Sequence, residues 1–274
     1  MNTPTKIPQF AVFGAPIKHS LSPKIHATFA SQCGIALEYL AVETPAEQFA
    51  SVLNDFAARG GVGANVTLPL KALALTLCTR LDASAERAGA VNTLIRVDHA
   101  WHGANTDGIG LVRDLTQRQQ LDLSGRRLLV IGAGGAARGV LAPLQAAGVT
   151  ELVIANRSLD KAQALAQQFN GQACALDQLE HQGAFDLIVH ASSAGHTEFT
   201  LPSWPDSLVR AGTALVDLSY GAASKPALAW ASEVDIVAFD GLGMLIEQAA
   251  EAFYLWHHQR PDTAPVWGML RAVV

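Results

Sequence analysis

Cysteine and charge are both scarce in this chain of 274 residues. The three cysteines, Cys33, Cys78 and Cys174, are odd in number and widely spaced, which favours free thiols in a reducing cytosol over a disulfide framework. Charged residues make up 16% of the chain and the net charge is −5, so nothing indicates nucleic acid or an acidic membrane as a partner. No leader of basic and then apolar residues opens the sequence, and no uncharged apolar run approaches the ~20 residues of a membrane span. We therefore expect a cytoplasmic protein.

Apolar residues, in contrast, make up half of the chain. Its length is at the size where a single core usually splits into two domains. We find no internal repeat and no low-complexity tract. The composition agrees with a soluble, two-domain enzyme, and the sequence leaves a monomer and a homodimer both open.

The most informative segment is the glycine-rich turn Gly132-Ala133-Gly134-Gly135-Ala136. It follows residues 127–131, which have the composition of a buried strand, and it opens the apolar, helix-like run 140–147. In this context one glycine makes the tight turn, the next lets the backbone approach a pyrophosphate, and the small third residue lets helix and strand pack closely. The pyrophosphate would rest on the unpaired N–H groups of the helix start. The segment predicts a dinucleotide site, and a glycine-rich turn without a ligand is the alternative.

Apolar runs and turn residues predict alternating strands and helices along the chain. In the first half we expect strands at residues 10–13, 38–42 and 63–66 and a hairpin of residues 91–97 and 100–104. In the second half we expect strands at 127–131, 151–155, 186–190, 214–218 and 235–239, and helices near the end at 242–258 and 263–271. We also expect Ser22 to cap a helix that starts at Pro23, and residues 44–47 to form a capping box. The second half is typical of a doubly wound parallel sheet, so the fold class is α/β.

Polar segments at residues 19–23, 65–71, 90–93, 105–108 and 240–244 interrupt the apolar pattern. The hydroxyls of Ser20 and Ser22 lie beside a helix start and can bind a carboxylate. The alternative is that Ser22 only caps the helix and Ser20 is an ordinary loop residue. Lys71 is the only charged residue between positions 59 and 80, which leaves a site and a solvated surface lysine both open. Asn92 lies inside an apolar strand and needs partners from the backbone or a ligand. Asp107 is a candidate carboxylate for chemistry, although alone it could be only a helix cap.

Taken together, seven segments resemble those of the shikimate dehydrogenase family and follow the family's order over nearly the full length. They are residues 14–23, 65–71, 89–93, 105–108, the glycine-rich turn, 217–220 and 240–245. The resemblance implies reversible NADPH-dependent reduction of 3-dehydroshikimate to shikimate, in the pathway to chorismate and the aromatic amino acids. It implies a substrate-binding catalytic domain of residues 1–107 plus 241–274 and an NADP-binding Rossmann domain of residues 108–240. The active site would lie in the cleft between them.

The resemblance also assigns roles to single residues. Lys71 and Asp107 would be the catalytic pair, because the alkoxide left by hydride transfer needs a proton and a carboxylate can orient the ammonium that supplies it. The substrate would be bound by Ser20, Ser22, Thr67, Asn92, Tyr220 and Gln248. The cofactor would be bound by Gly132, Ala133, Gly134, Gly135, Ala136, Asn156, Arg157, Ser158, Lys161, Leu218 and Gly241.

The end of the second strand of the predicted nucleotide domain indicates NADP rather than NAD. NAD-binding sheets carry an acid there for the ribose 2′-hydroxyl. Here the strand is followed by Asn156-Arg157-Ser158, and a guanidinium can bind a 2′-phosphate in forked fashion, with Lys161 as a second cation. Asp160 could reverse this preference, although we expect it to lie within the helix that Ser158 caps and to point away.

One departure from the family pattern and three alternatives remain. His190-Ala191-Ser192 stands where the family usually has Asn-Ala-Thr, in a segment that faces the cofactor, and we expect His190 to be an uncharged histidine satisfied at a strand end. His257 and His258 lack a third ligand, so we expect no metal.

A quinate/shikimate dehydrogenase would use NAD more readily, and a folate-directed relative should lack the serine pair and residues 105–108. A non-catalytic NADP-sensing module is opposed by the presence of both Lys71 and Asp107.

Overall fold

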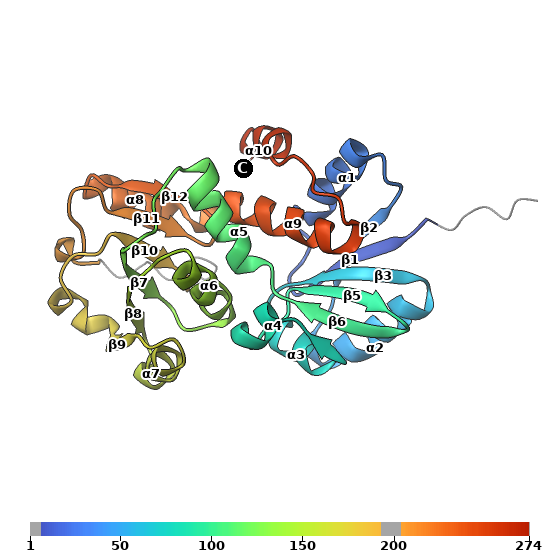
Figure 1. The fold of residues 1–274 in the computed structure, drawn as a ribbon, viewed down its shortest axis with the longest axis horizontal. Coiled ribbons are helices and arrows are strands. Elements are labelled where there is room, and N and C mark those ends of the chain that lie inside the picture. Colours follow the sequence, from blue (N-terminus) through green and yellow to red (C-terminus); the bar gives the residue numbers. More distant parts are fainter. Residues whose placement is uncertain (1–6, 193–203, 274) are drawn as a thin grey trace, which may run out of the picture. The chain divides into compact units, whose positions relative to one another are not determined.

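The computed structural model describes residues 7–192 and 204–273 and divides the chain into two compact units. The first unit comprises Met1–Thr106 and Ile246–Ala272, and the second comprises Asp107–Leu245 and Val273–Val274. Each unit contains its own six-stranded sheet (Figure 1). The α/β fold class is therefore confirmed.

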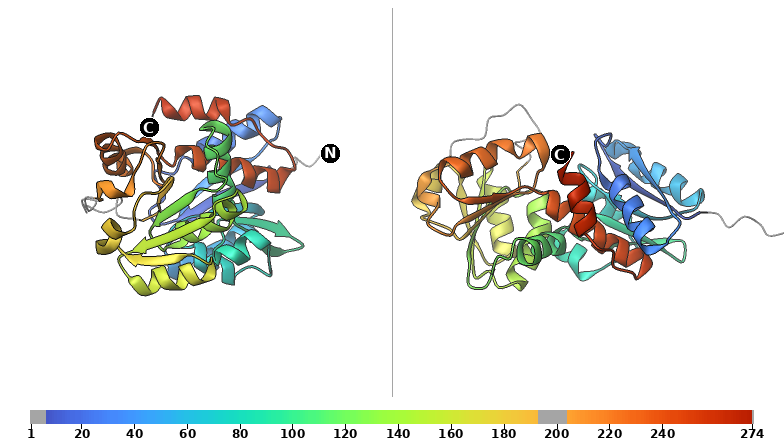
Figure 2. Two further views of the ribbon diagram at one scale, coloured as in Figure 1. Left: turned by 60° about the vertical axis from the view of Figure 1, so that its left-hand side comes forward. Right: turned by 90° about the horizontal axis from the view of Figure 1, so that it is seen from above.

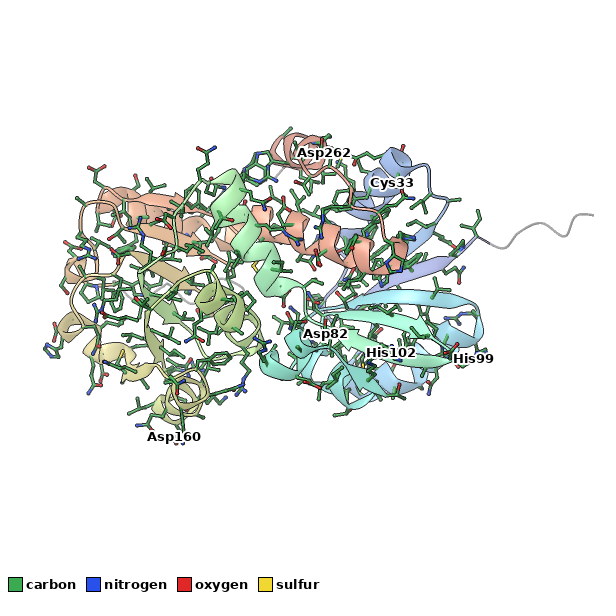
Figure 3. The ribbon with its side chains drawn as sticks, in the orientation of Figure 1. Cys33, Asp82, His99, His102, Asp160 and Asp262 are labelled. Atoms are coloured by element: carbon green, nitrogen blue, oxygen red, sulfur yellow. The ribbon has the colours of Figure 1, made fainter. Side chains whose placement is uncertain are left out.

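The sheet of the first unit is mixed, in the order β2-β1-β3-β5-β6-β4. Its strands are β1 (Gln9–Gly14), β2 (Glu38–Glu43), β3 (Gly61–Val66), β4 (Arg80–Leu81), β5 (Thr93–Val97) and β6 (Ala100–Ala104). Strand β1 runs parallel to β2 and β3, and β5 pairs antiparallel with β3 and β6. The hairpin of β5 and β6 is confirmed. Its turn residues Asp98 and His99 both have positive φ, the backbone of a tight two-residue hairpin turn, and His99 lies at its outer end (Figure 3).

Helices α1 (Ser22–Cys33), α2 (Phe49–Ala58), α3 (Lys71–Thr76) and α4 (Ala83–Ala88) complete the first half of the chain. The apolar spacing in α2 is confirmed, because Phe49, Leu53 and Phe56 are all buried in one core cluster. Two predicted caps are wrong. The N-cap of α1 is Leu21, and Ser22 is already the first helical residue. At residues 44–47 the 3₁₀ turn Ala46–Gln48 starts after Pro45 without a side-chain cap, because the Thr44 hydroxyl donates instead to the carbonyl of Val42 at 3.1 Å.

The sheet of the second unit is all parallel, in the order β12-β11-β10-β7-β8-β9. Its strands are β7 (Arg127–Ile131), β8 (Glu151–Asn156), β9 (Gln172–Ala175), β10 (Leu187–His190), β11 (Ala214–Asp217) and β12 (Val237–Phe239). Five of the six lie where the sequence predicts strands, whereas β9 was not predicted. The strand order reverses between β7 and β10, the arrangement of a doubly wound sheet with a topological switch point.

Helices cover both faces of this sheet (Figure 2). They are α5 (Asp107–Arg113), which continues as a wider turn over Asp114–Arg118, α6 (Gly135–Ala146), α7 (Leu159–Gln168) and α8 (Lys225–Glu233), with short turns at Leu176–His181, Asp206–Leu208 and Gly221–Ala223. Alternate residues of β7 belong to two different cores: Leu128 and Val130 pack with α6 and α7, and Leu129 and Ile131 pack with α8. Burial on both faces explains why β7 has a continuous apolar run rather than an alternating one.

The last two helices are α9 (Leu242–His257) and α10 (Ala264–Arg271), close to the predicted ranges. The second boundary between the units falls after Leu245, rather than after the predicted residue 240, and the first falls after Thr106 rather than after residue 107. The start of α9 explains the shift to Leu245, since Met244 is part of the core of the second unit and Gly243 packs directly against Asp114. Of the helices in the described ranges, none combines the length and apolar character that crossing a membrane requires.

Candidate active site

A buried network of amide and hydroxyl side chains lies at the strand ends of the first unit. Asn92 is at its centre: its Oδ1 accepts from the backbone N–H of Thr106 at 2.8 Å, and its Nδ2 donates to Thr106 Oγ1 at 3.0 Å and to Gln248 Oε1 at 3.3 Å. The Thr93 hydroxyl donates to Asn92 Oδ1 at 2.9 Å and accepts from Asn65 Nδ2 at 3.2 Å. All five residues are buried. Buried polar groups satisfied in this way hold one geometry, so Asn92 and Gln248 are brought together, as a shared site requires.

Tyr39, on the edge strand β2, extends this network beneath α1. Its hydroxyl donates to Asn65 Oδ1 at 2.6 Å, and its ring stacks on His26 with centroids 4.4 Å apart. Burial raises the pKa of Tyr39 well above its ordinary value and lowers the pKa of His26 to about 3. Both groups are therefore neutral at physiological pH, and they support the network without adding charge to it.

The sequence did not predict three residues that support the network: Tyr39, Asn65 and Thr106. Asn65 and Thr106 do lie within the polar segments 65–71 and 105–108, so the sequence indicated their neighbourhood. Tyr39 gives no signal, because an aromatic residue in an alternating strand is ordinary. Its role depends on the parallel alignment of β2 with β1, which places it near α1 and Asn65.

The two serines lie together at the start of α1. Ser22 is buried and Ser20 is half-buried, and the backbone N–H of Ser22 donates to Ser20 Oγ at 3.3 Å. Ser20, and not the predicted Ser22, therefore provides the side-chain contact to the helix start. The buried Ser22 hydroxyl does not cap the helix and instead makes a hydrogen bond with the side chain of Tyr39.

Lys71 is the first residue of α3 and is half-buried. Its carbonyl accepts the backbone N–H of Val91 at 2.9 Å, which attaches the start of α3 to the segment that leads to Asn92. Thr67, also half-buried, is attached to β1 through its N–H, which donates to the carbonyl of Phe13 at 2.9 Å. Lys71, Thr67 and Asn92 therefore belong to adjacent segments of one unit.

The remaining predicted substrate residues belong to the second unit. Asp107 is the first residue of α5 and is buried. Tyr220 follows β11 and is half-buried, and burial raises the pKa of its hydroxyl above the ordinary value. Of the predicted catalytic pair, Lys71 thus belongs to the first unit and Asp107 to the second.

The glycine-rich turn connects β7 to α6 in the second unit, as predicted. Gly132 has φ +122°, and a Cβ there would lie 2.9 Å from the carbonyl of Ala191. At Gly134 and Gly135 a Cβ would meet nothing within 4 Å, and α6 starts at Gly135 with Gly134 as an N-cap residue that provides no side-chain cap. A helix start without a side-chain cap and with space around its glycines suits a pyrophosphate. These residues fit the phosphate part of a dinucleotide.

Two glycine substitutions separate stability from ligand binding at this turn. Gly132→Ala should lower the free energy of unfolding by about 1–3 kcal/mol, because alanine would hold a left-handed backbone against a carbonyl. Gly134→Ala is the matched control: its backbone has φ −86° and a methyl group has space. It should unfold at the wild-type temperature and yet bind a dinucleotide more weakly. An equal loss of stability in both variants, measured by thermal denaturation, would contradict this account.

The carboxyl end of β8 carries no acid. The strand ends at Asn156, whose Nδ2 donates to the carbonyl of Ser158 at 3.0 Å. Arg157 and Lys161 are exposed, and Asp160 lies within α7 and is also exposed at its surface (Figure 3). Ser158 is the N-cap residue of α7, although its side chain makes no capping hydrogen bond. The arginine is therefore available at the position where sheets of this type bind the adenosine ribose.

Leu218 and Gly241, the last two predicted cofactor residues, are neighbours. A Cβ on Gly241 would overlap the carbonyl of Leu218, and the Gly241 N–H donates to the carbonyl of Ser219 at 2.7 Å. His190, at the end of β10, is buried with both ring nitrogens hydrogen-bonded, so its expected satisfaction is confirmed.

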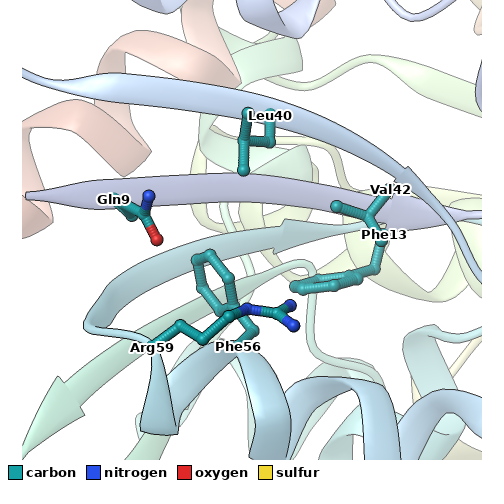
Figure 4. A pocket seen from close by; sticks show the side chains of 6 residues that line it. All are labelled: Gln9, Phe13, Leu40, Val42, Phe56 and Arg59. Atoms are coloured by element: carbon teal, nitrogen blue, oxygen red, sulfur yellow. The ribbon is translucent and has the colours of Figure 1, made fainter.

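A hollow between β1, β2 and α2 is lined by Gln9, Phe13, Leu40, Val42, Phe56 and Arg59 (Figure 4). None of its residues belongs to the polar network, so we do not assign the reaction to it. Within residues 7–192 and 204–273, His, Cys, Asp and Glu side chains form no group of three that could hold a metal ion.

Comparison with known proteins gives a consistent result over the whole chain. The family description "Shikimate dehydrogenase substrate binding domain" matches residues 12–94, "Shikimate / quinate 5-dehydrogenase" matches 114–252, and "Shikimate 5'-dehydrogenase C-terminal domain" matches 241–270. A shikimate dehydrogenase (NADP(+)) from Xylella fastidiosa strain M12 is 55% identical over 97% of this chain and 96% of its own length.

Solved structures agree. Shikimate 5-dehydrogenase from Thermus thermophilus, in complex with NADP(H) and shikimate, superposes with a TM-score of 0.88 at 34% identity, covering 98% of this chain and 100% of that one. An Ael1 enzyme from Pseudomonas putida superposes with a TM-score of 0.89 at 40% identity, covering 96% and 98%. Sequence motifs, fold and similarity lead to one assignment: the chain belongs to the shikimate dehydrogenase family.

Proposed function

We propose that this chain catalyses the reversible NADPH-dependent reduction of 3-dehydroshikimate to shikimate. The observation that carries the proposal is the 55% identity, over 97% of the chain, to a shikimate dehydrogenase (NADP(+)). The buried network around Asn92 and the glycine-rich start of α6 support the proposal as candidates for the substrate site and the cofactor site.

Lys71 and Asp107 carry the proton chemistry in this proposal. NADPH, when bound, supplies the hydride to the carbonyl carbon of the substrate. The Lys71 ammonium stabilises the negative charge that develops on the carbonyl oxygen and donates a proton to it. Asp107 orients that ammonium and accepts a hydrogen bond from a neighbouring hydroxyl of the ring. In the reverse direction Lys71 accepts the proton of the shikimate hydroxyl.

The remaining polar residues bind the substrate. Ser20 and Ser22 hold the carboxylate, with Tyr220 as a further donor. Thr67, Asn92 and Gln248 surround the ring hydroxyls. The network supports these last roles, because Asn92 and Gln248 are already oriented by hydrogen bonds to Thr106 and so lose little freedom on binding.

The second unit binds the cofactor. The turn Gly132–Ala136 receives the pyrophosphate, Asn156, Arg157, Ser158 and Lys161 receive the adenosine 2′-phosphate, and Leu218 and Gly241 lie at the nicotinamide side. The test is a turnover assay with shikimate and quinate, each with NADP and NAD. We expect efficient oxidation only of shikimate with NADP. Equal use of the two cofactors would indicate a quinate/shikimate dehydrogenase, and no turnover would indicate an NADP-sensing module.

Arg157 should determine the cofactor preference. Arg157→Ala should weaken NADP by about ten- to hundredfold, which corresponds to the ~1.5–3 kcal/mol of a hydrogen bond to a charged group. The same variant should bind NAD as the wild type does, so NAD is the internal control. Kinetic constants for both cofactors check the prediction, and an equal loss with NAD would show that Arg157 does not contact the 2′-phosphate.

We also propose that the enzyme acts in the cytoplasm as a monomer or a homodimer. All three cysteines are free thiols, and burial raises the pKa of Cys78 to about 11 and that of Cys174 above its ordinary value. Protonated thiols of this kind suit a reducing compartment. Light scattering of the purified protein would distinguish the two assemblies.

A further inference from the structure

Three side chains of the second unit form a hydrogen-bonded chain that the proposed reaction does not use. His190 Nδ1 lies 2.8 Å from Asp217 Oδ2, and His190 Nε2 lies 2.6 Å from Ser192 Oγ. His190 and Asp217 end the neighbouring strands β10 and β11, where they are paired in register, and both are buried. Ser192, two residues past the end of β10, is half-buried.

The direction of the hydrogen bonds follows from Asp217. A buried carboxylate only accepts, and Asp217 already accepts the backbone N–H of Ser219 at 2.7 Å through Oδ1. Its Oδ2 therefore takes the hydrogen on His190 Nδ1, and in this Nδ1–H tautomer the ring Nε2 is an acceptor. The Ser192 hydroxyl then donates to Nε2. Because its one hydrogen is committed, any further partner of Ser192 Oγ must be a hydrogen-bond donor.

Ser192 lies beside the glycine-rich turn. The backbone N–H of Ala191 donates to the carbonyl of Ile131 at 2.8 Å, and a Cβ on Gly132 would lie 3.0 Å from the Ser192 nitrogen. The sheet order reverses between β7 and β10, so Ser192 is at the switch point where a dinucleotide crosses from one half of the sheet to the other. The adenosine end of the cofactor is assigned to the half of the sheet that contains β8. The nicotinamide nucleoside would therefore lie at the other half, formed by β10, β11 and β12.

We propose that Asp217 and His190 position Ser192 as a hydrogen-bond acceptor for a donor group on the nicotinamide nucleoside of the cofactor. Two groups there have this chemistry, the ribose hydroxyls and the carboxamide NH₂. Phosphate oxygens do not, since they only accept. The inference rests on the proposed use of NADP. His190 and Asp217 are positioning residues in it, and Ser192 makes the contact.

A truncation series of ligands tests the contact by isothermal titration calorimetry. The series is adenosine 2′-phosphate 5′-diphosphate, 2′-phospho-ADP-ribose and NADP⁺, which add in turn the diphosphate, the second ribose and the nicotinamide. Ser192→Ala should bind the first ligand as the wild type does and should bind NADP⁺ about three- to tenfold more weakly, the worth of one ordinary hydrogen bond. Ser192→Thr, which keeps the hydroxyl, should retain the wild-type affinity.

Each outcome of the series decides something. A weakening that starts with 2′-phospho-ADP-ribose assigns the contact to the ribose, and one confined to NADP⁺ assigns it to the carboxamide. A weakening that is already present with the diphosphate would mean a phosphate contact and would overturn the proposal, as would an unchanged affinity for NADP⁺ or equal losses in the Ala and Thr variants. A wild type that binds none of the three ligands would instead overturn the assignment of the cofactor.

The role of His190 is tested by non-additivity. His190→Phe removes both ring nitrogens, so it should weaken NADP⁺ as Ser192→Ala does, and the double variant should be no weaker than either single one. Additive losses would show that His190 does not act through Ser192. Replacing His190 leaves the buried Asp217 without its histidine partner, so the thermal unfolding midpoint of each variant is measured to show that it still folds. Should His190→Phe not fold, the comparison of Ser192→Ala with Ser192→Thr still decides the contact.

Discussion

Lys71→Ala is expected to lower kcat by about 10²–10⁴-fold, the usual worth of a positioned general acid or base. The side chain is half-buried at the first position of α3, in a segment without another charge between residues 59 and 80. Steady-state kinetics with shikimate and NADP measures the loss. The variant should fold normally, because alanine favours a helix and the carbonyl that accepts the N–H of Val91 is retained.

Lys225→Ala provides the matched control for this variant. Lys225 is also the first residue of a helix, α8, and it is exposed. Its replacement removes the same charge and should leave kcat unchanged. Wild-type kcat in Lys71→Ala would contradict the assignment and leave Asp107 as the candidate acid and base.

Replacing both Ser20 and Ser22 by alanine is expected to raise KM for shikimate by about 10²-fold or more, with a smaller effect on kcat. Each lost hydrogen bond to a carboxylate costs ~1.5–3 kcal/mol, and the carboxylate is remote from the reacting carbon, so substrate and transition state lose the contact equally. Initial rates over a range of shikimate concentrations, at saturating NADP, measure both constants.

The single variants separate binding from helix capping. Ser20 Oγ accepts the backbone N–H of Ser22, so Ser20→Ala should lower stability by about 0.5–2 kcal/mol as a lost cap. Ser22→Ala removes no side-chain cap but removes the hydrogen bond with Tyr39, so the unfolding temperature of each single variant is measured beside its KM. An unchanged KM in the double variant would mean that the hydroxyls only stabilise the start of α1.

The strands and long helices could be predicted because their apolar patterns come from burial, which acts on each segment in the same way. Strand β9 could not, since it has four residues, begins with an exposed glutamine and buries only Cys174 fully. The two wrong caps have a shared reason. Ser22 and Thr44 each had the right residue type, but the helical turn starts one residue earlier than predicted after Leu21 and one residue later than predicted after Pro45.

The candidate site could be predicted only in part. Motif residues such as Lys71, Asn92 and Gln248 were found from the resemblance, and the hydrogen bond between Asn92 and Gln248 agrees with a shared site. The supporting contacts could not be found, because strand pairing brings Tyr39 to Asn65 across 26 residues of chain and Thr106 to Asn92 across 14. The partners of His190 likewise depend on the alignment of β10 with β11.

The division of the chain has a consequence for the order in which the protein is made. The first unit is discontinuous: it is begun by residues before 107 and completed by α9 and α10, and the second unit is inserted between them. Gln248, which contacts Asn92, and Trp256, whose Nε1 donates to the carbonyl of Leu94 at 3.0 Å, both belong to α9. During synthesis the second unit has all its strands before these residues leave the ribosome. We therefore expect the inserted unit to fold first and the substrate-binding network to close only when translation is nearly complete.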